Sequence, residues 1–226
     1  MKTILLTLVL MGLVSTSMAA PRSELENRII KLDAKFEALQ QKPDKAIPAE
    51  QLEKAKGIIL LDRTKAGFIF GYQGGSGVAM AKDPKTKKWS APVFMNANEA
   101  SLGFQIGGQQ TFVVMLLMST NAVNGLTDPK YKFGGEASGT AGDESTAAEG
   151  EVTPKEPSML LYTNTKGLYG GATIKGGSIE ASITDTGIYY GKAHSLEDIL
   201  FEKKAAPSEA AVALTETLVK YSKKAK

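Results

Sequence analysis

Cysteine is absent from this sequence, and histidine occurs once in its 226 residues. The missing cysteines exclude disulfide bonds, thiolate metal sites and thiol nucleophiles. The lone His194 and the lack of an Asp-x-Asp loop closed by a glutamate leave no ligand set for zinc or calcium, so we expect no metal and no cofactor. His194 precedes Ser195, and helix capping by Ser195 explains this local sequence without a catalytic role.

Charge of one sign and long apolar runs are also scarce. The chain has 27 Lys and Arg against 24 Asp and Glu, a formal charge of +3, so it lacks the strong basic excess of nucleic-acid binders. Beyond the N-terminus, the most apolar stretch is Phe112 to Met118, which is too short to span a bilayer. Glu99 is a candidate general acid, but no second carboxylate lies at a recognisable spacing. We therefore expect a protein that is not an enzyme and binds no nucleic acid.

Residues 1–19 have the pattern of a signal peptide. Lys2 is followed by an apolar run from Ile4 to Val14, and Ser17 and Ala19 suit positions −3 and −1 of a cleavage site after Ala19. The apolar run is too short to cross about 30 Å of hydrocarbon. We expect an exported protein, periplasmic or secreted, that is soluble or peripherally bound to a membrane.

Helical periodicity is clearest near the two ends of the mature chain. Residues 23–40 carry apolar side chains at spacings of three and four, with Ser23 as the expected N-cap. A short helix is expected between Pro48 and Gly57, another from Ser195 to Phe201, and a last one from Pro207 onward. The stripe of the first helix also suits a membrane interface, but its mixed charges favour packing on its own domain. The stripe consists of Leu25, Ile29, Leu32, Phe36 and Leu39.

Strands are expected through the middle of the chain. Val78 to Met95 reads as a hairpin around the turn Asp83-Pro84-Lys85-Thr86, and residues 112–118 suit a strand buried on both faces. Residues 119–126 suggest one or two helical turns. Residues 132–152 are rich in Gly, Ala, Ser and Thr and suit either a linker or closely packed strands, which we favour. The remaining expected strands are 58–61, 68–72, 102–106, 159–162, 168–172 and 178–183.

The resulting fold class is α+β, with one domain made of a mostly antiparallel, glycine-rich sheet and N- and C-terminal helices. A barrel-like sheet and a two-layered one both remain open. We divide the chain into a signal peptide (1–19), an N-terminal helical segment (20–47) and a main domain (48–226). The glycines at 71, 74, 75 and 77 could form a phosphate-cradling loop, but a strand follows them, which favours tight turns or bulges.

Short motifs from Pro48 onward resemble the SYLF domain family. They cover most of the mature chain, and their specificity lies in their order. This resemblance implies a non-catalytic α+β domain that binds phosphoinositides and other acidic lipids; the actin-regulatory role of eukaryotic members is not expected of an exported chain. The motifs are 55–58 (AKGI), 71–78 (GYQGGSGV), 89–94 (WSAPVF), 103–109 (GFQIGGQ), 113–118 (VVMLLM), 132–135 (KFGG), 159–162 (MLLY), 166–171 (KGLYGG) and 190–191 (YG).

The most suggestive candidate site is a basic hairpin tip. Lys82, Lys85, Lys87 and Lys88 surround it, and Trp89 follows. The ammonium groups could meet anionic lipid while the ring sits at the headgroup level, or the lysines could form a solvated turn with the tryptophan buried beneath it. We predict a peripheral lipid-binding protein of the cell envelope that recognises anionic headgroups. A structural module that meets an envelope protein is the alternative.

Overall fold

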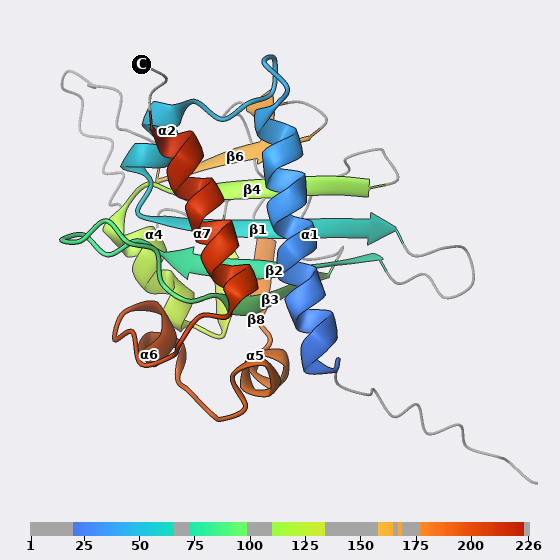
Figure 1. Ribbon diagram of the computed structural model, residues 1–226, viewed down its shortest axis with the longest axis vertical. Coiled ribbons are helices and arrows are strands. Elements are labelled where there is room, and N and C mark those ends of the chain that lie inside the picture. Colours follow the sequence, from blue (N-terminus) through green and yellow to red (C-terminus); the bar gives the residue numbers. More distant parts are fainter. Residues whose placement is uncertain are drawn as a thin grey trace, which may run out of the picture.

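A computed structural model of the protein describes residues 20–65, 73–98, 110–133, 158–164, 167–168 and 177–223. The predicted signal peptide, the strands expected at 68–72 and 102–106, Glu99 and most of 132–152 lie outside these residues. Within the described residues, two helices come first, two groups of four strands follow with short helices between them, and three helices end the chain order (Figure 1). They are α1 (Arg22–Gln40), α2 (Ala49–Lys54), β1 (Gly57–Lys65), β2 (Gln73–Ala81), β3 (Val93–Asn98), β4 (Gln110–Leu117), α4 (Thr120–Asn124), the 3-10 helix η1 (Gly125–Thr127), β5 (Lys130–Phe133), β6 (Met159–Thr163), β7 (Gly167–Leu168), β8 (Gly177–Ala181), α5 (Ile183–Tyr190), α6 (Leu196–Leu200) and α7 (Glu209–Ser222).

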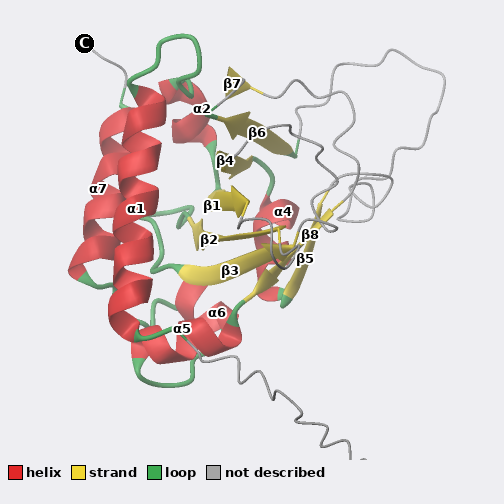
Figure 2. Ribbon diagram, turned by 90° about the vertical axis from the view of Figure 1, so that its right-hand side faces the viewer, coloured by secondary structure: helices red, strands yellow, loops and turns green. Residues whose placement is uncertain are grey.

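The strands form one eight-stranded sheet in the order β5-β8-β3-β2-β1-β4-β6-β7. Every pairing between the described strands is antiparallel. Figure 2 shows that the sheet curls, with α1, α2 and α7 stacked against one side. The predicted α+β class, single domain and antiparallel sheet are confirmed, and the curl favours the barrel-like alternative, with β5 and β7 as the two edges of the described sheet.

Both faces of the central strands are buried. In β4, Phe112, Val114 and Leu116 face the α1 and α7 side, while Val113, Met115 and Leu117 face α4, η1 and α6. All six side chains are at most 2% exposed. Continuous apolar strands are typical of sheets covered on both sides, so the prediction for this segment is confirmed.

The first and last helices pack side by side over one face of the sheet (Figure 1). The whole predicted stripe of α1 is buried, so this helix packs on its own domain, as its mixed charges favoured. Ser23 is not the N-cap; Pro21 occupies that position in an extended conformation with no side-chain cap. Proline suits the start of a helix because its fixed φ and missing N–H cost nothing there.

Two further boundaries differ from the prediction. Gly57 does not close α2, which ends at Lys54 with Ala55 as its C-cap; it begins β1, where a Cβ would lie 2.9 Å from the Val123 side chain. Ile183 does not end a strand but starts α5, capped by Ser182, whose hydroxyl accepts a hydrogen bond from the Asp185 N–H. The sequence did not predict this helix because its eight residues make only about two turns, which is too short for a clear helical period.

Polar contacts tie α1 to its neighbours. Arg28 forms a 2.9 Å ion pair with Asp185 of α5, and Lys220 of α7 forms one of 2.8 Å with Glu37. Because each pair joins segments more than 150 residues apart, α1 is held by parts of the chain that are distant in sequence. The fixed helices and sheet leave the β2–β3 connection as a projecting hairpin end (Figure 1).

Glycine 77 is the tightest point of the sheet. A Cβ there would lie 1.8 Å from the Leu60 carbonyl oxygen, so Gly77→Ala must push two paired strands apart. We expect this substitution to lower the free energy of unfolding by about 3 kcal/mol or more. Urea denaturation followed by circular dichroism measures the change.

The matched control is Gly187→Ala in α5, where nothing lies within 4 Å of the added Cβ. It should leave stability unchanged or raise it by up to about 1 kcal/mol, because alanine is the better helix former. Equal stability of the two variants would contradict the packing described for β1 and β2.

Candidate functional site

The predicted lysines lie on the connection between β2 and β3. The hairpin is confirmed: Lys82 and Trp89 form a β-bridge at its end, and the next residues, 83–88, make a tight loop that we call the lysine turn. The Asp83 carboxylate accepts hydrogen bonds from the backbone N–H groups of Lys85 (2.8 Å) and Thr86 (2.7 Å). These bonds fix the backbone that carries the lysines, as in other aspartate-initiated turns.

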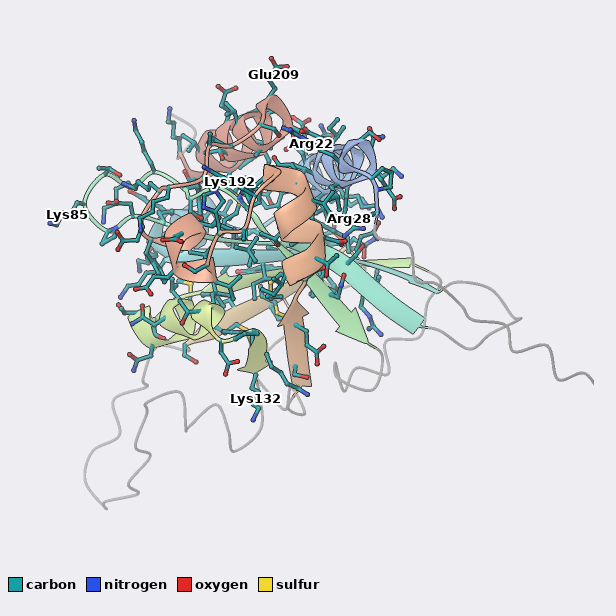
Figure 3. All side chains as sticks on the ribbon, turned by 90° about the horizontal axis from the view of Figure 1, so that it is seen from below. Arg22, Arg28, Lys85, Lys132, Lys192 and Glu209 are labelled. Atoms are coloured by element: carbon teal, nitrogen blue, oxygen red, sulfur yellow. The ribbon has the colours of Figure 1, made fainter. Side chains whose placement is uncertain are left out.

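Three lysines of the turn are exposed and unpaired. Lys85, Lys87 and Lys88 are exposed, and no carboxylate pairs with any of them within the part of the chain that the structure describes. Figure 3 shows Lys85 reaching outward at one edge of the molecule, far from Lys132 and Lys192. The lysine turn is therefore a local concentration of positive charge on a chain that is nearly neutral overall.

Lys82 differs from the other three. Its ammonium group is half-buried and donates hydrogen bonds to the carbonyl oxygens of Leu52 (2.8 Å) and Glu53 (3.1 Å) in the last turn of α2. It also lies 4.5 Å from the centroid of the Trp89 ring. Burial, reinforced by the nearby charge of Lys87, lowers the pKa of Lys82 to about 8. This lysine holds α2 against the hairpin. Two of its three N–H donors are used in that contact and are not available to a ligand.

Trp89 lies at the base of the hairpin and not at its tip. Its side chain is 9% exposed and belongs to the core on the α1 and α7 side of the sheet. The ring therefore offers little surface to a membrane, and the geometry matches the alternative in which it is buried beneath a solvated turn. The ring packs beneath the ammonium group of Lys82 in a cation–π contact.

A cavity of about 390 Å³ opens beside the lysine turn, and we call it the lysine pocket. Ligand sites of small molecules commonly have this size. Two acids, Glu53 and Asp83, and an apolar wall of Val123, Leu200 and Phe201 complete it. The pocket is lined by six lysines: Lys54, Lys56, Lys82, Lys87, Lys88 and Lys203.

The local sequence predicted only three of these six lysines, namely Lys82, Lys87 and Lys88. Lys54 and Lys56 come from the end of α2 and the loop after it, and Lys203 comes from the loop after α6. Lys203 pairs with Asp83 across 120 positions of sequence, and no local pattern indicates that contact. Lys85, which the sequence did single out, does not line the pocket.

Ser195, which was considered together with His194, has a structural explanation. The Ser195 hydroxyl accepts a hydrogen bond from the Asp198 N–H (3.0 Å) and the Asp198 carboxylate accepts one from the Ser195 N–H (3.2 Å), so the predicted cap is a full capping box. His194 lies with its ring edge-on to Tyr190. Across the described ranges, no group of three or more His, Asp or Glu side chains could hold a metal ion, and no helix is long and apolar enough to cross a membrane.

The lowered pKa of Lys82 makes stability depend on pH. Between about pH 8 and the ordinary lysine value of 10.5, the folded state binds fewer protons than the unfolded chain. Stability contributed by this group should therefore rise with pH across that window, by an amount on the order of 1 kcal/mol after solvent screening. Urea denaturation of the wild type and Lys82→Met at both ends of the window measures it, since other titrating groups cancel in the difference. An identical pH slope in both proteins would contradict the half-buried ammonium.

Comparison with known proteins finds several relatives whose similarity covers more than half of this chain. Human SH3 domain-containing YSC84-like protein 1 is 31% identical over 170 residues, which cover 74% of this chain and 49% of the relative. The Xenopus laevis protein of the same name is 31% identical over 171 residues. LAS seventeen-binding protein 3 of Saccharomyces cerevisiae is 31% identical over 140 residues, or 60% of this chain and 30% of the relative. The chain thus spans about half the length of the animal relatives, and the relatives are named for binding or for their domains, not for a reaction.

A family model described as Ysc84, Las17-binding protein actin regulator, matches residues 98–221. No solved structure matches the chain. The matched segment is more than half of the chain, and it runs from the end of β3 through β4 into α7. With the identity to the animal proteins, this confirms the predicted resemblance: the chain belongs to the Ysc84 family of Las17-binding actin regulators, the SYLF domain family.

Proposed function

We propose that this protein is a non-catalytic module that binds anionic phospholipid headgroups at a membrane surface of the cell envelope. The observation that carries the proposal is the lysine turn, where Lys85, Lys87 and Lys88 are exposed, adjacent and unpaired by acids among the described residues. A rigid projecting loop with three free ammonium groups suits contact with a flat, negatively charged surface.

The energetics are sufficient for peripheral binding. A lysine near an anionic bilayer contributes roughly 1 kcal/mol, so three together contribute about 3 kcal/mol, or a factor of more than a hundred in affinity. The contribution falls with salt because the charges are solvent-exposed. The aspartate that shapes the turn is neutralised by Lys203, whose ammonium and the two backbone N–H groups hold the pKa of Asp83 well below its usual range. It therefore stays paired and adds little repulsion toward lipid.

Export is the second part of the proposal. Its support is the signal-peptide pattern of residues 1–19, which lie outside the described residues. Absence of catalysis is the third part, and its support is the structural role of Ser195, whose hydroxyl caps α6. The relatives' names, which refer to Las17 binding, suggest a protein partner as the competing function.

Reversing the charge of the turn tests the lipid proposal. The variant Lys85→Glu, Lys87→Glu, Lys88→Glu should lose at least about a hundredfold in affinity for vesicles of phosphatidylcholine mixed with phosphatidylglycerol. Co-sedimentation of the mature chain at several salt concentrations measures binding, and wild-type binding should weaken as salt rises.

The matched control carries Lys31→Glu, Lys132→Glu and Lys192→Glu, three exposed lysines on other elements, and it has the same change in formal charge. It should keep most of the wild-type affinity for the vesicles, because we expect binding to depend on the position of the lysines and not on net charge alone. Equal losses in the two triple variants would remove the lysine turn as the binding surface. Absence of wild-type binding to anionic vesicles would favour a protein partner instead.

A further inference from the structure

The lysine pocket holds three features that the fold alone does not require. An ammonium group is half-buried, two like charges lie close together, and two lysines have left-handed backbone. Each is unfavourable by itself, and all three meet at one cavity of about 390 Å³. Violations of local preference that converge on one place are typical of functional sites.

The left-handed residues are the clearest sign. Lys87 has φ of 60° and Lys203 has φ of 55°, and these are the non-glycine residues with positive φ in the described ranges. Glycine is the ordinary residue for this conformation, with asparagine and aspartate next. Both positions are lysine, and both line the pocket. A requirement for an ammonium group at each place explains the choice better than a requirement of the turn.

The charges inside the pocket are only partly compensated. Lys203 is paired with Asp83, Lys56 donates to the Thr120 hydroxyl (3.0 Å), and Lys82 donates to the α2 carbonyl oxygens. Lys87 and Lys88 have no such partner among the described residues, and Lys87 lies near enough to Lys82 to oppose its charge. An anion between them would relieve this repulsion and would accept hydrogen bonds from several sides.

The apolar part of the pocket lining indicates what the anion is attached to. Val123 from α4, Leu200 from α6 and Phe201 just after it line the same pocket as the lysines. A ligand that is charged at one end and apolar at the other would contact both. A phosphate monoester has a charge of about −1.5 to −2 and three strong acceptor oxygens at its free end. A phosphodiester has one charge and is substituted on both sides, so it cannot present a free end to converging lysines.

We propose that the lysine pocket binds the phosphate monoester end of an amphiphile, with Lys87 and Lys88 as its main cationic contacts. This inference rests on the proposed function and adds selectivity to it. The exposed turn would attract any anionic surface, whereas the pocket would distinguish a terminal phosphate from a bridging one. The ligand's source is either a lipid headgroup such as phosphatidic acid or a free phosphate ester.

Vesicles that contain phosphatidic acid or phosphatidylglycerol, adjusted to equal surface charge, separate selectivity from general attraction. Wild-type protein should bind the phosphatidic acid vesicles about tenfold more tightly. Glycerol 3-phosphate in solution, followed by NMR of the lysine side chains, should shift Lys87 and Lys88 if the pocket takes the group without a bilayer.

Lys87→Gly is the decisive variant because it removes the ammonium group and relieves the left-handed strain together. It should lose the preference for phosphatidic acid while its thermal midpoint stays unchanged or rises. Lys88→Met should also lose the preference and provides a second measurement that does not depend on φ. The control is Lys85→Ala in the same turn, which lies outside the pocket lining and should keep the preference.

The outcomes separate the two proposals. Equal binding of both vesicle types, with no response to glycerol 3-phosphate, would overturn the pocket and leave general lipid binding standing. Binding of glycerol 3-phosphate without binding to either vesicle would support the pocket, identify a soluble phosphate ester as its ligand and overturn the lipid proposal. An unchanged preference in both Lys87→Gly and Lys88→Met would overturn the assignment of these two lysines.

Discussion

The burial of both faces of β1 and β4 is the constraint on which the rest of the structure depends. The segments 58–61 of β1 and 112–117 of β4 are apolar at every position, so neither face can be left in water and the sheet needs a cover on each side. The pair α1 and α7 covers one face, and α4, η1 and α6 cover the other. The lysine pocket lies beside the hairpin end and is lined from the last turn of α2, from α4 and from the end of α6 with the loop after it.

Much of the fold could be predicted from the sequence because its signals are local. The stripe of α1, the cap of α6, the start of α7 and the apolar run of β4 each depend on residues within one or two turns of one another. α5 could not be predicted in this way. Its Ser182 cap is local, but α5 is also held by the ion pair between its Asp185 and Arg28 of α1, which lie 157 positions apart.

The lysines of the candidate site also fall into two groups, those predictable from local sequence and those brought in by long-range contacts. Lys82, Lys85, Lys87 and Lys88 follow one another on a turn, so the sequence places them together. The contribution of Lys54, Lys56 and Lys203 depends on strand pairing and helix packing over long separations. The sequence also left open whether Trp89 is inserted or buried; the sheet decides this, because its alternation directs the ring inward beneath Lys82.

The pairing of the first helix with the last has a consequence for how the protein is made. The apolar stripe of α1 finds its neighbour α7 only when the end of the chain has emerged, and their ion pair joins positions 183 apart. Long-range closure of this kind slows folding, because loop entropy must be overcome before the contacts form. Packing of α1 is therefore completed only after α7 has been synthesised.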